Sequence, residues 1–225
     1  MAIDIRRSDG RYVSRAPGIT TWHSFSFGKH YDAENVRHGA LVVHDEHVLE
    51  PGAGFEAHRH RDVEVVSWVL EGALHHQDSL GNRGVLRPGT LQWLHAGAGV
   101  EHTESNRSPS HPIEPTRVIQ SWLTPIEGDA PHLTHVELSD ALTGGELVCG
   151  VGWPGAALSI GRPAAGQRVV MPDAPEVHLY VARGSLVLDG TGPLAPGDAA
   201  RLTYTGRREL VAQQDAEVLV WAASA

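Results

Sequence analysis

The sequence predicts an all-β protein made of two similar domains, each a sandwich, jelly roll or barrel of short strands. Three observations predict this fold. Glycine and proline supply 25 + 14 = 39 of the 225 residues, which disfavours long helices. Apolar residues alternate with polar ones or form short runs bounded by Gly, Pro or Asp. One β unit occurs twice along the chain.

The expected elements follow from these short apolar segments. In the first half the strands are 40–44, 63–70, 73–78, 90–95 and 116–123. In the second half they are 146–151, 156–160, 167–171, 177–182, 185–189, 198–204, 209–212 and 217–222. Two stretches, 32–37 and 139–142, are expected to be short helices. A density of strands this high is typical of a barrel or sandwich and leaves helices a minor part.

The repeat places an aromatic strand, a Gly turn, a second strand, a hairpin and a Pro-Gly turn in the same order twice. Its first copy comprises 68–74 and 87–91, and its second copy 180–186 and 195–199. The join is expected within 124–131, a stretch with Pro and acidic residues. We therefore expect an N-terminal domain at 1–127 and a C-terminal domain at 128–225.

Composition excludes several function classes. Eighteen Lys and Arg stand against 27 Asp and Glu, so the net charge of −9 disfavours direct binding to nucleic acid or to an anionic membrane. The single cysteine, Cys149, excludes an intramolecular disulfide and a multi-cysteine metal site, and its apolar neighbours predict burial. No signal peptide or long apolar stretch is evident, so we expect a cytoplasmic, soluble protein, able to stand as a monomer.

Histidine is in marked excess, at 15 residues, and two pairs of side chains indicate a metal site. His58 and His60 are two residues apart, as are His102 and Glu104, and this spacing places both members of a pair on one face of a strand. If the two strands are opposed, three imidazoles and one carboxylate converge. Such donors suit Fe(II), Mn(II), Ni(II), Co(II) or Zn(II), and ligand type does not exclude copper.

The second copy of the repeat serves as an internal comparison. The offsets of the repeat align the four metal-site residues with Val170, Pro172, Leu210 and Ala212, which are all apolar. The C-terminal domain is therefore expected to bind no metal.

Other histidine-containing or catalytic patterns carry less weight. The segment 44–47 has the wrong spacing for a helical metal motif and is expected to be a solvated turn. His75 and His76 point to opposite faces of a strand, so at most one of them could face a pocket, and the default expectation for both is the surface. His95 either borders the site or is simply buried. No G-x-S-x-G segment exists, and no partner set for a catalytic triad is evident.

These residues resemble the pirin family of two-domain cupins. Gly52, His58, His60, Glu64 and Gly72 follow the first cupin motif with one extra residue, and Gly99, His102 and Asn106 follow the end of the second motif. The more specific pirin pattern is similar to 58–62, 69–72, 78–82 and 96–106 of this chain, together with the early segment 22–28. The strong resemblance covers about residues 20–125.

The resemblance implies two tandem cupin domains, the first holding one Fe(II) ion through His58, His60, His102 and Glu104. Mn, Ni, Co, Cu or Zn are the alternatives for the ion. Glu64 is expected no closer than the surroundings of the ligands, where it could orient a ligand imidazole. Some pirins are similar to quercetin 2,3-dioxygenases, which cleave flavonols with O2 and release carbon monoxide. Others resemble iron-dependent regulators that act through protein partners.

For the enzyme, the resemblance implies a flavonol-like substrate whose hydroxyl proton passes to Glu104. Phe25, Phe27 and Phe55 are expected either to form the wall for a flat aromatic ligand or to be ordinary core residues. The alternative is a non-catalytic, redox-responsive iron protein. A third interpretation is a structural zinc protein with a closed four-coordinate site.

Overall fold

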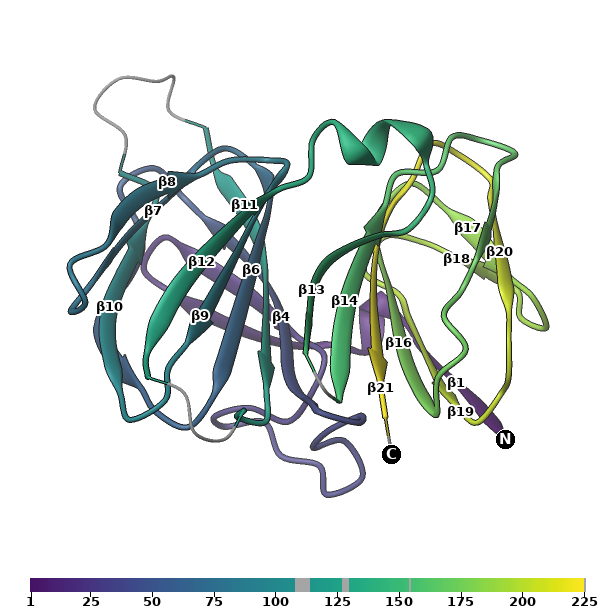
Figure 1. Ribbon diagram of the computed structural model, residues 1–225, viewed down its shortest axis with the longest axis horizontal. Coiled ribbons are helices and arrows are strands. Elements are labelled where there is room, and N and C mark those ends of the chain that lie inside the picture. The colour runs from purple at the N-terminus through teal and green to yellow at the C-terminus, as the bar shows by residue number, and fades with distance from the viewer. Residues whose placement is uncertain (108–113, 127–129, 154, 225) are drawn as a thin grey trace. The chain divides into compact units, whose positions relative to one another are not determined.

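The computed structural model describes residues 1–107, 114–126, 130–153 and 155–224. The chain divides into two compact units. The N-unit comprises Tyr12–Arg37 and Leu41–Glu137, and the C-unit comprises Met1–Arg11, His38–Ala40 and Leu138–Ala225. Figure 1 shows that each unit consists almost wholly of strands, which confirms the all-β class.

The N-unit has two antiparallel sheets. The larger has the order β12-β9-β6-β11-β4-β3-β2, and the smaller has the order β5-β10-β7-β8. Their bounds are β2 Tyr12–Ala16, β3 Ile19–His23, β4 Leu41–Leu49, β5 Gly54–His60, β6 Glu64–Glu71, β7 Leu74–Asp78, β8 Arg83–Leu86, β9 Thr90–His95, β10 Val100–Ser105, β11 Thr116–Leu123 and β12 His132–Glu137.

The C-unit is built in the same way, with sheets in the orders β1-β19-β16-β21-β14-β13 and β15-β20-β17-β18. Its strands are β1 Ala2–Arg6, β13 Val148–Trp153, β14 Ala156–Gly161, β15 Arg168–Val170, β16 Glu176–Arg183, β17 Leu186–Leu188, β18 Pro193–Leu194, β19 Ala199–Thr203, β20 Glu209–Ala212 and β21 Glu217–Ala223. Short 3-10 turns lie at η1 Ser8–Gly10 and η2 Ala141–Gly144.

The topology confirms the repeat predicted from the sequence. Strands β4 to β11 of the N-unit occupy the same positions in their sheets as β14 to β21 of the C-unit. The equivalent hairpins turn at Gly72 and Gly184, whose φ angles of 72° and 67° lie in the left-handed region that favours glycine.

The interiors of the two units differ in chemistry. The C-unit is filled by a cluster of thirteen buried apolar side chains. In the N-unit the apolar clusters are smaller, one around Val69 and Leu74 and another around Leu94 and Val100. Much of the remaining interior of the N-unit is polar, and most of the buried histidines among the described residues lie there.

Several sequence-based expectations were wrong. Residues 32–37 form turns instead of a helix, and the second short helix is a 3-10 turn displaced to Ala141–Gly144. The segment 44–47 is the buried middle of β4 instead of a solvated turn, because β4 continues to Leu49. Cys149 is exposed instead of buried. Strands β1, β2, β3, β8, β12 and β18 were not expected.

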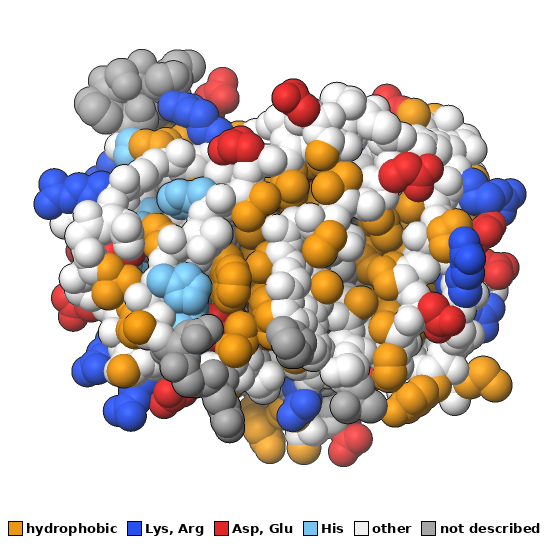
Figure 2. All heavy atoms as spheres, in the orientation of Figure 1, with side chains coloured by type: hydrophobic (Ala, Val, Ile, Leu, Met, Phe, Trp, Pro, Cys, Tyr) orange, Lys and Arg blue, Asp and Glu red, His pale blue; other side chains and the backbone are white. Residues whose placement is uncertain are grey.

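The expected domain boundary, between 127 and 128, falls outside the described residues, so it stays a prediction. The compact units assign the N-terminal strand β1 to the C-unit, where it pairs with β19. No helix in the described part of the chain has the length and apolar character needed to cross a membrane. On the face shown in Figure 2, the described Lys and Arg side chains lie scattered and form no continuous basic patch.

Candidate metal centre and adjoining pocket

The sequence-predicted imidazoles meet where β5 and β10 pair in the N-unit. His102 lies directly opposite His58 across the antiparallel pair, and a register shift follows on the β5 side before Phe55. The Nε2 atoms of His58 and His102 are 2.9 Å apart. One nitrogen from each of His58, His60 and His102 lies within 4.8 Å of the others. The predicted convergence of these three imidazoles is therefore present.

Glu104 lies two residues beyond His102 on the same face of β10 and is 1% exposed. Its Oε2 accepts a hydrogen bond of 2.5 Å from Nε2 of Gln120 on β11. Its Oε1 is buried without a hydrogen-bond partner among the described residues. A buried carboxylate oxygen without a partner is costly, so this atom needs a cation or a donor.

His76 on β7 forms a second cluster with His102 and Glu104. Its Nδ1 lies 3.9 Å from Glu104 Oε1 and 3.5 Å from His102 Nδ1, and its Nε2 lies 3.2 Å from Asp78 Oδ2. The expectation that His76 lies at the surface was wrong, because its side chain faces the interior of the N-unit and is buried. The sequence signal was present in the alternation of β7, which turns one of the two adjacent histidines inward.

The electrostatics favour metal-binding forms of these side chains. Burial lowers the pKa of His60 to about 4, and the neighbouring imidazoles of His102 and His58 act in the same direction. Burial also lowers the pKa of His102 to about 4, against the opposing effect of Glu104. Burial raises the pKa of Glu104, but His76, His102 and Gln120 outweigh it, so this pKa falls to about 2. His60 and His102 are thus neutral and Glu104 is ionised at neutral pH, as metal coordination requires.

The pKa of His76 moves the other way. Burial lowers it, but hydrogen bonding and charge from Glu104 and Asp78 outweigh burial and raise it above 6.5. His76 is therefore the imidazole of this region that best tolerates a positive charge beside the carboxylates.

Glu64 and His95 are buried away from the three converging imidazoles. The Oε1 of Glu64 accepts from His95 Nδ1 at 2.7 Å and from the backbone N–H of Ile126 at 3.0 Å, and its Oε2 accepts from Trp93 Nε1 at 2.7 Å. Glu64 therefore ties β6 to β9 and to the segment after β11, and no ligand imidazole is among these partners. His95 is an ordinary buried residue.

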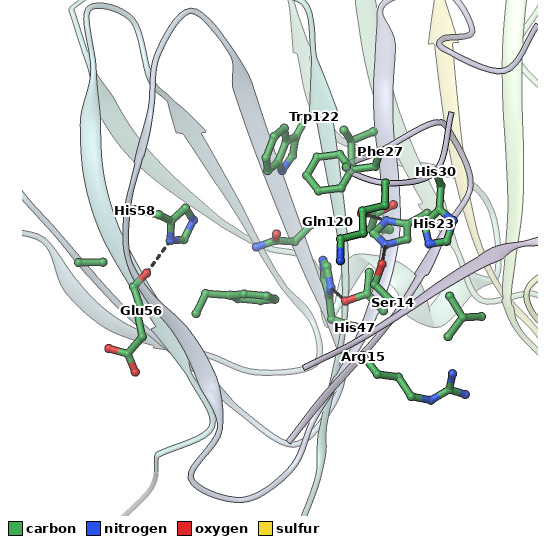
Figure 3. Close-up of a pocket in the computed structure, with 18 residues that line it drawn as sticks. Ser14, Arg15, His23, Phe27, His30, His47, Glu56, His58, Gln120 and Trp122 are labelled. Atoms are coloured by element: carbon green, nitrogen blue, oxygen red, sulfur yellow. Dashed lines mark hydrogen bonds and ion pairs between the residues drawn. The ribbon is translucent and has the colours of Figure 1, made fainter. Parts of the chain in front are cut away.

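A pocket of about 860 Å³ opens beside His58 within the N-unit. Figure 3 shows Phe27, Trp122 and Gln120 along its wall, with His23, His47 and Ser14 farther along. Phe55 also lines it, whereas Phe25 does not and is a core residue at 1% exposure. The volume is sufficient for a drug-sized aromatic molecule, and the walls combine aromatic rings with several polar side chains.

Sequence reasoning missed the polar side of this pocket. Three of its residues, Thr21, His23 and Asp45, come from β3 and β4. Their proximity depends on the register of β3 against β4, in which His23 lies directly opposite Asp45. Nothing in the spacing of these residues along the chain gives that register.

The sequence of this chain matches a known protein family. The sequence profile of the family described as Pirin matches residues 6–123. This chain belongs to the pirin family. The match includes β2 to β11 and therefore all of the converging side chains.

Relatives align with this pirin over nearly its whole length. A protein of Mycobacterium tuberculosis named "Putative quercetin 2,3-dioxygenase" is 43% identical, over 97% of this chain and 94% of that protein. A protein of Escherichia coli named quercetin 2,3-dioxygenase is 28% identical, over 97% of each chain. The crystal structure of a bacterial pirin from Escherichia coli in complex with nickel(II) has a TM-score of 0.87 and 26% identity, covering 99% of each chain. The bicupin fold is thereby confirmed.

The residues of this pirin fit a divalent metal ion. Imidazole nitrogens and a carboxylate oxygen are suitable donors, and the partnerless Oε1 of Glu104 supplies a negative charge that only a cation or a donor would balance. Both clusters of potential metal ligands found among the described residues belong to the N-unit.

The sheet register refines the comparison with the C-unit. Glu104 lies opposite His76 in the N-unit, and Leu210 lies opposite Leu188 in the C-unit. Leu210 is thus the counterpart of Glu104, two residues before the position that the sequence offset indicated. Both leucines belong to the apolar cluster of the C-unit. A C-unit without metal remains a prediction.

Proposed function

We propose that this pirin is a metal-dependent dioxygenase that cleaves flavonols with O2, and that His58, His60, His102 and Glu104 hold one Fe(II)-type ion. The observation that carries the proposal is the position of His58. It belongs to the converging imidazoles and also lines the aromatic pocket, so a ligand in the pocket would reach the metal. The names of the relatives in Mycobacterium tuberculosis and Escherichia coli support the reaction class.

When bound, the ion supplies a Lewis acid for the substrate oxygen and a redox centre for O2. The side chains of the chain do the remaining work. Phe27, Phe55 and Trp122 bind the flat rings and exclude water. Glu104, ionised and oriented by Gln120, accepts the proton of the flavonol hydroxyl.

The experiment is oxygen uptake with quercetin, using protein loaded anaerobically with Fe(II) and with verified metal content. We expect O2 consumption that matches flavonol loss and carbon monoxide release, and we expect none in His58→Ala. His38→Gln, a histidine change in the C-unit, is the matched control and should retain the rate. Turnover by fully loaded His58→Ala, or none by fully loaded wild type, would overturn the proposal.

Glu104→Gln separates the two roles of the carboxylate. If Glu104 accepts the proton, a metal-loaded variant binds quercetin and loses turnover. If the variant turns over at the wild-type rate with its metal intact, Glu104 is not the base.

A further inference from the structure

The far end of the pocket holds a Ser–His–Asp arrangement that the reaction proposed above does not use. His23 Nδ1 lies 2.7 Å from Asp45 Oδ2, and His23 Nε2 lies 2.9 Å from Ser14 Oγ. All three side chains line the pocket, and Figure 3 shows Ser14 beside His23. These are the nucleophile–base and base–carboxylate hydrogen bonds of a serine hydrolase triad. We propose that Ser14, His23 and Asp45 form a second catalytic site, one that hydrolyses aryl esters.

The hydrogen bonds fix the protons as this chemistry requires. A carboxylate can only accept, so His23 Nδ1 carries a proton and donates it to Asp45. Nε2 of the neutral ring is then an acceptor, and the Ser14 hydroxyl donates to it. His23 is therefore in the tautomer that removes a proton from serine.

The surroundings of His23, the proposed base, are buried and hold its ring in place. His23 is 4% exposed and Asp45 is 3% exposed, whereas Ser14 is exposed. His23 also stacks on Phe27, with ring centroids 5.4 Å apart. Asp45 Oδ1 is buried without a hydrogen-bond partner among the described residues. The hydrogen bond from His23 Nδ1 to Asp45 Oδ2 fixes the orientation of the ring toward Ser14.

The sheet geometry explains how the three residues meet. His23 on β3 is directly opposite Asp45 on β4, and Ser14 lies on the neighbouring strand β2, paired with Thr21. Side chains on one face of three adjacent strands are near neighbours. The three residues of the triad are separated in the sequence, so no short sequence motif contains all of them.

The pocket defines the class of substrate. Its aromatic walls suit an aryl group, and the cation Lys29 in its lining favours the negative oxygen that develops on an attacked ester carbonyl. Ser14 Oγ bonds to the ester carbon while its proton moves to His23 Nε2. The carbon–oxygen bond to the phenol then breaks, and His23 returns the proton to the phenolate. Water repeats the sequence on the acyl-serine and releases the acid.

The proposed ester hydrolysis does not depend on the proposed dioxygenase activity, but the product of the dioxygenase would belong to its substrate class. Loss of the middle ring carbon of a flavonol as carbon monoxide, with both atoms of O2 retained on the flanking carbons, leaves an aryl ester that bears a carboxylate. An ester of this class would form in the same pocket and could be cleaved there.

The test is hydrolysis of 4-nitrophenyl benzoate by protein freed of metal with a chelator, followed by absorbance of the released 4-nitrophenolate. We expect Ser14→Ala to lower the rate by about 100-fold or more, with similar losses in His23→Gln and Asp45→Asn. Ser185→Ala, the same change in the C-unit, should retain the wild-type rate. Thermal unfolding checks each variant, and Ser14 is exposed, so its variant should fold even if the buried ones do not.

A covalent probe gives the second readout. Diisopropyl fluorophosphate should label Ser14 in the metal-free protein, as identified by peptide mass. Hydrolysis that survives in Ser14→Ala, labelling elsewhere, or no hydrolysis above that of free imidazole would each overturn the proposal. Metal removal abolishes oxygen uptake but not ester cleavage, so failure of one activity is distinguishable from failure of the other.

Discussion

At the scale of single residues, His76 connects the metal-binding side chains to the polar interior. A histidine that binds metal through Nε2 normally donates its Nδ1 proton to a fixed acceptor. When the single proton of neutral His76 lies on Nε2, facing Asp78, its Nδ1 is such an acceptor at 3.5 Å from His102 Nδ1, and Asp78 and Gln92 hold the ring in place.

We therefore predict that His76→Leu lowers metal affinity by about 10–100-fold without removing a ligand. His76→Gln, whose amide oxygen can still accept, should restore most of it. Competition with a chromophoric chelator measures the affinity. Equal affinity in His76→Leu and the wild type would show that the ring does not orient His102.

A change at Glu64 should lower stability and leave metal binding unchanged, because the carboxylate of Glu64 has a structural role. Three donors converge on it, and an amide in its place would direct an N–H group at one of them. We predict that Glu64→Gln lowers the free energy of unfolding by about 2–3 kcal/mol and leaves the metal content unchanged. Urea unfolding and elemental analysis measure the two quantities. Loss of metal from the folded variant would instead make Glu64 a ligand.

From the sequence alone, only part of the candidate site could be predicted. The shared faces of His58 with His60 and of His102 with Glu104 could be predicted because each pair lies on one strand, where spacing fixes the face. His76, Ser14, His23 and Asp45 could not, because their proximity depends on how separate strands align.

At the scale of elements, most strands inside the sheets were predictable, whereas five strands at sheet edges, β1, β2, β8, β12 and β18, were not. In β2, Ser14, Arg15 and Ala16 are exposed, so the strand shows no apolar alternation. β1 does alternate apolar and charged residues, but it is a short strand at the edge of its sheet and was missed. The helix expected at 32–37 is made of turns, because a short polar stretch has no apolar face to hold a helix against a core.

The two repeat turns provide a test at this scale. A Cβ at Gly184 would contact the carbonyl oxygen of Asp215, and one at Gly72 would lie 2.9 Å from that of Pro115. Gly206 has a similar φ of 69° and open space around it. We predict that Gly184→Ala destabilises most, then Gly72→Ala, with Gly206→Ala costing only about 1–2 kcal/mol of backbone strain. Urea unfolding gives the order, and an equal cost at all three positions would contradict the contacts.

At the scale of the whole molecule, the free energy of unfolding should depend on pH through His38, which belongs to the C-unit and not to the unit of the candidate metal ligands. Burial lowers the pKa of His38 below 6.5, with Arg201 acting in the same direction and Glu176 opposing it. Its Nε2 lies 3.2 Å from the carbonyl oxygen of Val177, and its ring lies beside that of His178.

Because the unfolded chain takes up this proton first, the free energy of unfolding falls as the pH drops below 6.5. The loss ends once the folded protein is also protonated. We predict a smaller loss in His38→Gln, measured as the difference between the two proteins in urea unfolding at pH 7.5 and 5. Parallel pH dependence in both proteins would exclude His38 as a source.

The repeated architecture makes one unit polar inside and the other apolar. The C-unit has Leu188 and Leu210 where the N-unit has His76 and Glu104, so the same strand order supports a packed apolar core in one unit and a buried polar cluster in the other.

Metal stoichiometry by elemental mass spectrometry tests this account most directly. We predict one divalent ion per chain in the wild type and in His38→Gln, and none in His102→Ala, which removes the imidazole shared by both clusters. A folded His102→Ala protein that retains the wild-type ion would contradict the assignment of the metal centre to the N-unit.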